Sequence, residues 1–184
     1  MGQPRREVVW QQAVPASSRG ASGGRGAAQM KRTLSAPSYA LLQASVECWK
    51  CGEATPVTSV WVPSFVDYAD VDEPGDEPEA GDAATLHGIQ DLDDQVAAHV
   101  REAAPWLKPG RSETANATYW ANHCQACGVL QGDYFVTGVN GPFFPQFRAE
   151  ADALELIPGR GPLSANATAA QSEWMDWIAE RLPV

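Results

Sequence analysis

The sequence predicts a small α+β or mainly β domain: a small antiparallel sheet with two cysteine-bearing turns, a long, acidic, partly helical insertion between them, and a C-terminal helix. Three observations lead to this prediction. All four cysteines lie in two C-x-x-C-G stretches, Cys48–Gly52 and Cys124–Gly128. β-Branched and aromatic residues, which favour strands, flank both stretches. Apolar residues recur at helical spacing near residues 92–103 and 174–182.

The two C-x-x-C-G stretches are interpreted as halves of one tetrahedral metal site. Two cysteines separated by two residues can bind one ion when the backbone turns tightly between them, and the glycine that follows permits the positive φ angle of such a turn. Four thiolates select zinc, or alternatively iron. A disulfide pair and a redox-active C-x-x-C are the competing interpretations; the first needs an oxidising compartment and the second a strand-to-helix junction. The predicted ligands are Cys48, Cys51, Cys124 and Cys127.

Composition and charge restrict the possible partners. The 184 residues suit one small domain with tails, and the 16 glycines and 14 prolines indicate many turns. Residues 1–32 carry six basic residues and one acid, a net charge of +5, so the total of −10 leaves −15 on residues 33–184. Nucleic acids bind through phosphate neutralisation by lysine and arginine, so this acidic body favours a protein partner. No apolar run reaches the ~18 residues of a membrane span and no secretory signal is evident, so a cytoplasmic location is expected.

Residues 1–38 are expected to form a disordered basic tail, because the stretch Ser17–Gly26 has no apolar periodicity. Met30 is a candidate for the biological start, in which case residues 1–29 do not belong to the native protein. A basic arm that contacts a polyanion is the alternative.

The folded domain is expected to span residues 39–184, with strands around each cysteine pair. Gly141–Pro145 is expected to form a rigid aromatic turn that covers one face of the sheet, with an exposed aromatic patch for a partner as the alternative. Gly132-Asp133 suggests a bulge in the strand that leaves the second pair. The expected strands are 45–47, 55–62, 118–122, 129–131, 134–136 and 153–157.

The insertion is assigned to residues 64–117. Residues 67–82 hold eight acids in sixteen residues, which predicts a solvated, extended loop; a calcium loop is the alternative, but its prolines do not fit an EF-hand. A helix is expected from Asp91 to Pro105, with His99 on its surface, and residues 107–117 are expected to be loop.

A second helix is expected over residues 168–182. Thr168 and Gln171 have capping-box spacing, and Trp174 and Trp177 belong to one apolar stripe. Such a stripe usually packs on the core, although it can also seal a dimer or a partner groove.

The cysteine turns resemble those of zinc-ribbon and rubredoxin-like proteins, in which two C-x-x-C-G turns face each other from neighbouring hairpins. Cys48–Glu53, followed by Asn122–Phe135 and Gly141–Pro145, is similar to a set of uncharacterised bacterial proteins. This resemblance covers residues 45–64 and 118–146 and implies the four cysteines as ligands and a bacterial source, without implying an activity. The chain departs from ordinary zinc ribbons in its spacing, because 72 residues, 52 through 123, separate the pairs instead of about fifteen to twenty.

No sequence motif indicates catalysis. A structural zinc site leaves no open coordination position, and the chain lacks a nucleophile elbow, a phosphate-binding Gly-Lys pair and an H-E-x-x-H motif. His123 is a candidate substitute ligand, and Asp133 is either a catalytic carboxylate or the cap of its own turn. The expected function is a zinc-stabilised cytoplasmic module for protein interaction or regulation, and not an enzyme. The alternatives are a nucleic-acid-binding zinc ribbon and a rubredoxin-like iron electron-transfer protein.

Overall fold

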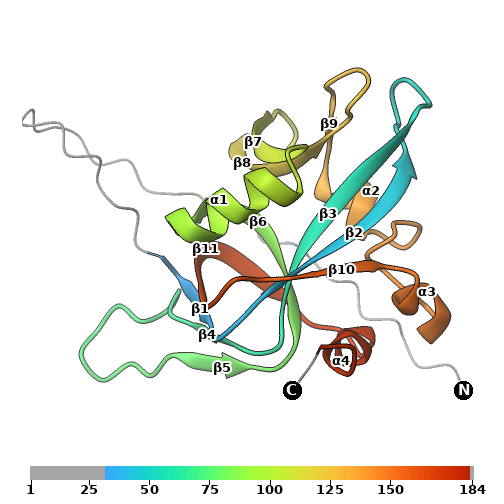
Figure 1. The fold of residues 1–184 in the computed structure, drawn as a ribbon. Helices are drawn as coiled ribbons and strands as arrows, with labels where there is room; N and C mark the ends of the chain where they lie inside the picture. The colour runs from blue at the N-terminus through green and yellow to red at the C-terminus, as the bar shows by residue number, and fades with distance from the viewer. Residues whose placement is uncertain (1–31, 183–184) are drawn as a thin grey trace, which may run out of the picture.

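The computed structural model describes residues 32–182, which form two antiparallel sheets and four helices (Figure 1). The expected α+β or mainly β class is confirmed, but the main sheet is much larger than the expected small one. In spatial order its eight strands are β10 (Glu155–Pro158), β2 (Ala40–Glu47), β3 (Ala54–Val62), β6 (Ala84–Leu92), β11 (Leu163–Ala170), β1 (Leu34–Ala36), β4 (Phe65–Asp67) and β5 (Glu79–Gly81). The smaller sheet contains β7 (Leu107–Ser112), β8 (Ala117–His123) and β9 (Leu130–Gln131).

The β2–β3 hairpin carries the first cysteine pair at its tip. The two strands pair along their whole length, from Ala40 opposite Trp61 to Glu47 opposite Ala54. The second pair lies in the turn between β8 and β9. Figure 1 shows the two turns side by side at one end of the molecule. Sequentially distant cysteines are therefore brought together by neighbouring hairpins.

Hydrophobic residues fill both faces of the main sheet, as the two-residue period of strands requires. Leu41, Val60 and Val62 belong to a buried cluster with the helix α1 (Asp94–Ala103). Leu42 and Trp61 point to the other face, into a second cluster with residues of three short helices. These helices are α2 (Asp133–Thr137), α3 (Arg148–Asp152) and α4 (Trp174–Ala179).

Several strands occupy segments that were expected to be loop, tail or helix. Residues 34–36, assigned to the tail, form β1; residues 107–112, assigned to a loop, form β7. Within the segment called an insertion, β6 lies at the centre of the main sheet, between β3 and β11. Thr168, the expected cap of the C-terminal helix, lies in β11, so α4 begins later than expected. The rest of the expected tail, including Met30, lies outside the described residues.

The helices also differ from expectation in where they begin, in what they bury and in which residues form them. Asp93, and not Asp91, caps α1, because its Oδ1 accepts a hydrogen bond from the N–H of Val96 at 2.9 Å. His99 is buried and not on the helix surface, because its Nδ1 lies 2.8 Å from the hydroxyl of Tyr39. Residues 134–136 were expected to form a strand with a bulge before it, but they belong to α2.

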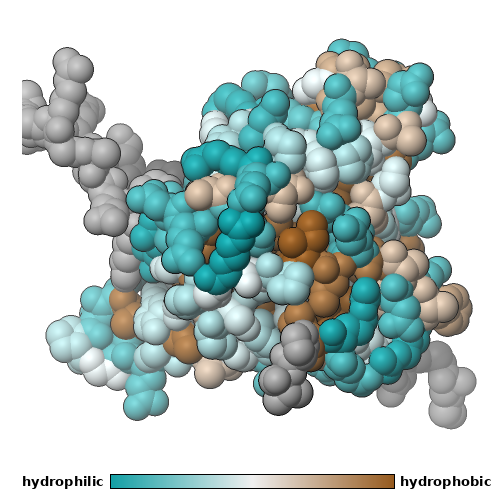
Figure 2. All heavy atoms as spheres, in the orientation of Figure 1, coloured by the Kyte–Doolittle hydropathy of each residue, from teal (hydrophilic) through white to brown (hydrophobic). Residues whose placement is uncertain are grey.

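The surface of the molecule is predominantly hydrophilic on the face drawn in Figure 2, with hydrophobic side chains gathered near its middle, where β10 passes in Figure 1. Among the described residues, no helix has both the length and the apolar character needed to cross a membrane.

Candidate metal centre and adjoining groove

The two cysteine turns have the same backbone geometry. In the first, the N–H of Gly52 donates to the carbonyl of Cys48 at 2.9 Å, and in the second the N–H of Gly128 donates to the carbonyl of Cys124 at 2.8 Å. Both glycines have positive φ angles, 75° and 73°, as the sequence pattern requires. The turns therefore present their sulfur atoms in equivalent ways.

The structure brings all four predicted cysteines together. Their Sγ atoms lie within 4.8 Å of one another. The Sγ atoms of Cys48 and Cys127 are 3.7 Å apart, and so are those of Cys51 and Cys124. A tetrahedral ion with metal–sulfur bonds of about 2.3 Å places its ligands about 3.8 Å apart. The thiols are thus positioned to bind one metal ion, and the donor set fits zinc or iron.

The environment of the cluster favours thiolates at selected positions. Burial raises the pKa of Cys48, but the backbone N–H groups of Cys51 and Lys50 outweigh this effect and lower the pKa to about 6. The pKa of Cys124 is also lowered, chiefly by the N–H of Cys127. These amides stabilise negative charge on the two buried sulfur atoms.

Cys51 illustrates how a cation would complete the cluster. The N–H of Glu53 favours the Cys51 thiolate, but desolvation and the neighbouring sulfur atoms raise the pKa of Cys51 to about 12. A second thiolate beside the first is costly because like charges repel at this separation. A bound divalent cation would remove this repulsion and allow all four groups to ionise.

Polar contacts hold the two hairpins together around the cluster. Buried Gln131 donates from Nε2 to the Sγ of Cys48 at 3.3 Å. The N–H of Gln125 donates to Oγ1 of Thr55 at 3.0 Å. Further along, Asn122 and Thr58 form two hydrogen bonds: the N–H of Thr58 donates to Oδ1 of Asn122 at 2.8 Å, and Nδ2 of Asn122 donates to the carbonyl of Thr58 at 3.0 Å. The asparagine amide thus links β8 to β3 as a neighbouring strand would.

Trp49 connects the first cysteine turn to β9 and α2. Its Nε1 donates to the carbonyl of Leu130 at 2.9 Å, and its ring stacks on Phe135 of α2 with the centroids 6.0 Å apart. About half of each aromatic side chain is exposed. The first cysteine turn and α2 therefore share one continuous aromatic surface.

The two additional polar candidates lie away from the cysteine cluster. His123 Nδ1 lies 2.8 Å from the carbonyl of Ala121, and its ring packs against Gly110 of β7, so His123 is not part of the cluster. Asp133 begins α2 and accepts from the N–H of Gly88 at 3.2 Å. Burial raises the pKa of Asp133, while the Gly88 N–H and nearby His87 oppose this shift. Asp133 therefore joins α2 to β6.

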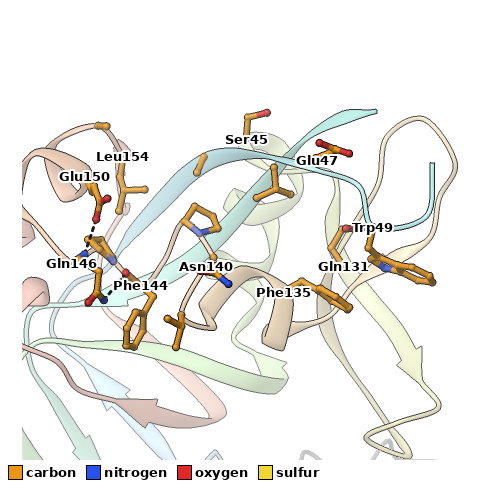
Figure 3. Close-up of a pocket in the computed structure, with 17 residues that line it drawn as sticks. Ser45, Glu47, Trp49, Gln131, Phe135, Asn140, Phe144, Gln146, Glu150 and Leu154 are labelled. Carbon is orange, nitrogen blue, oxygen red and sulfur yellow. Dashed lines mark hydrogen bonds between the residues drawn. The ribbon is translucent and has the colours of Figure 1, made fainter. Parts of the chain in front are cut away.

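A groove of about 880 Å³ adjoins the metal turns (Figure 3). Its lining includes the end of β2, the aromatic residues Trp49, Phe135 and Phe144, and the start of the connection from α3 to β10. A second hollow of about 680 Å³ also has Trp49 and Phe135 in its lining. Sequence reasoning missed both, although the Gly141–Pro145 aromatic turn was one available signal: Phe143 is buried and Phe144 is partly exposed.

Comparison of the chain with protein-family models, with curated proteins and with solved structures found no match. The chemistry that the site can perform follows from its geometry: four thiols around one position, a neighbouring aromatic pair and an adjacent groove.

Proposed function

We propose that the chain is a zinc-stabilised protein-interaction module of the cytoplasm. The observation that carries this proposal is the location of the exposed hydrophobic side chains. Within residues 32–182, the large hydrophobic residues with high exposure are Trp49, Tyr134, Phe135, Val139, Phe144 and Phe147. One belongs to the first metal turn and the others to a single segment beside it. Exposed hydrophobic residues gathered in this way are typical of a surface that binds a partner.

In this proposal zinc has a structural role. Four cysteine thiolates fill a tetrahedral site, so no coordination position is left for a substrate. The ion fixes the first turn against the second and thereby holds Trp49 against Phe135. Reduced thiols persist in the cytoplasm, which supports that location.

The metal is tested by elemental analysis of protein purified without chelator, together with folding measured by circular dichroism after metal removal. About one zinc per chain, with loss of structure on removal, supports the structural site. A coloured, redox-active iron protein would favour electron transfer instead. Absence of bound metal would contradict the zinc assignment.

The interaction surface is tested by site-specific photocrosslinking in the organism that encodes the chain. A photoreactive amino acid at Phe135 should capture a specific protein, whereas the same group at Tyr68, next to β4 near the opposite edge of the main sheet, should not. The captured protein is then purified, and its affinity for wild-type chain and for Phe135→Ser is measured by calorimetry. Equal capture from both positions, or equal affinity for both proteins, would contradict an interaction through this surface.

A further inference from the structure

One edge of β2 is only half covered. On one side β2 pairs with β3 from Ala40 to Glu47, but on its other side β10 pairs only with Ala40 to Gln43. Beyond Glu155, the first residue of β10, the chain leads back through Leu154 to α3 and no longer runs beside β2. Among the described residues, nothing pairs with this side of the 44–47 segment.

The hydrogen-bond pattern shows which backbone groups face the uncovered side. Thr58 N–H and carbonyl bond to Asn122, so they point away from β2, and the Thr58–Gln43 pair is a non-hydrogen-bonded pair of the β2–β3 ladder. Such pairs alternate with hydrogen-bonded ones along an antiparallel ladder. Ser45, two residues on, therefore also directs its N–H and carbonyl outward, and Glu47 does the same. Pro56, opposite Ser45, agrees with this pattern because it has no N–H to donate.

The uncovered edge forms one wall of the groove described above. Ala44, Ser45, Val46 and Glu47 all line it. In Figure 3 the segment runs along the groove, with Phe144 and Phe135 below it and Trp49 at one end. The four residues span about 13 Å, enough to pair with a short extended segment. The free backbone donors and acceptors of β2 thus lie in the same groove as the aromatic side chains.

Charge restricts what can enter. The ionisable groups among the groove-lining residues are Glu47 and Glu150, both acidic and at opposite ends in Figure 3. The folded part of the chain is strongly acidic as well, at −15 for residues 33–184. An acidic segment would be repelled, whereas lysine or arginine would be attracted.

We propose that the groove binds an extended, basic peptide segment of a partner protein, which adds a strand to the free edge of β2 at residues 44–47. Main-chain hydrogen bonds to Ser45 and Glu47 provide affinity, alternate apolar side chains of the peptide contact the aromatic lining, and basic side chains meet the two glutamates. This inference rests on the proposed interaction function and specifies the chemistry of its ligand.

The test uses random twelve-residue peptides displayed on phage, selected against the full, metal-loaded chain. Synthetic versions of the enriched peptides are then measured by fluorescence anisotropy. We expect basic sequences with alternating apolar residues. Ser45→Pro should weaken their binding by about tenfold or more, because proline lacks the outward N–H and its ring blocks the edge. Ser45→Ala, the matched control, removes only the hydroxyl and should change affinity by less than about twofold.

A second measurement on the wild-type chain does not depend on the folding of a variant. N-methylation of the peptide at alternate residues should abolish binding in one register and preserve it in the other, since only every second N–H faces β2. Failure to enrich any peptide, acidic consensus sequences, or equal binding to wild-type and Ser45→Pro chains would overturn strand addition. If the photocrosslinked partner binds Ser45→Pro as tightly as wild type, strand addition is wrong while the interaction function stands. If Phe135 captures no partner, the interaction function itself fails.

Discussion

Replacing Asn122 with alanine tests the link between the two sheets. The Asn122 amide forms two hydrogen bonds, of 2.8 and 3.0 Å, with the backbone of Thr58, and both residues are at most 3% exposed. The substitution leaves a buried N–H and a buried carbonyl without partners. Each such group costs about 1–3 kcal/mol, so the free energy of unfolding should fall by about 2–6 kcal/mol. For a domain of this size, the corresponding fall in Tm is roughly 5–20 °C.

Urea denaturation of the metal-saturated proteins, followed by tryptophan fluorescence, measures this change. Asn166→Ala is the matched control: its side-chain contacts with Thr33 and Gln90 are partly exposed and 3.4 Å long, so its loss should cost well under 1 kcal/mol. A loss below about 1 kcal/mol for Asn122→Ala would refute the view that this amide takes the place of a strand partner.

Three further predictions concern buried groups. Burial lowers the pKa of His99, so the unfolded chain binds more protons than the folded one just below pH ~6.5. The free energy of unfolding should therefore fall as the pH drops through this range. Denaturation measured between pH 5 and 8 should show a weaker dependence of stability on pH for His99→Gln than for the wild type. Gln131→Ala should weaken metal binding by about 10–100-fold in competition with a chromophoric chelator, whereas Gln125→Ala, which changes an exposed side chain, should not. Trp61 is fully buried and its Nε1 has no hydrogen-bond partner within residues 32–182, so Trp61→Phe should cost less than about 1 kcal/mol in thermal denaturation. A loss of about 3 kcal/mol or more would contradict the view that removing the unpaired N–H offsets the lost packing.

The cysteine turns could be predicted because their geometry is local. A C-x-x-C-G stretch specifies a tight turn through residues next to one another, and Gly52 and Gly128 adopt the positive φ angles that the pattern requires. The strands next to the turns follow for the same reason, since β3 and β8 are rich in β-branched and aromatic residues. The long segment between the two cysteine pairs did not prevent them from meeting, because closing a long loop costs little more free energy than closing a short one.

The larger sheet could not be predicted because its central strands lack a local signature. β6 contains Gly88 in a positive-φ conformation and polar residues at several positions, and β11 is mostly alanine, serine and threonine. Their strand conformation comes from pairing with each other and with β3, which are contacts between distant residues. The segment 134–136 shows the opposite error, because its aromatic residues favour a strand but it forms part of α2. Asp133 begins this helix, and its carbonyl accepts a hydrogen bond from the hydroxyl of Thr137. Tertiary pairing decided the conformation of β6 and β11, whereas local helix contacts outweighed strand propensity at residues 134–136.

The same contacts explain how the metal can control the groove. The inner half of the β2–β3 hairpin is held on both sides, because β10 covers Ala40–Gln43 and β6 pairs with Val60–Val62. The outer half has no strand on either side among the described residues. It depends on the cysteine cluster, on the Thr55–Gln125 bond and on the Asn122 amide.

Metal removal should therefore release the outer half before the inner half. Amide hydrogen exchange read by mass spectrometry should show faster exchange at the residues of the outer half that bond to β3, such as Val46, after chelation, and little change at Leu42. Peptide binding to the β2 edge should weaken in parallel, because the edge and Trp49 lose their fixed positions together. Uniform acceleration along β2 would instead mean that the ion stabilises the whole domain and does not act specifically on the binding edge.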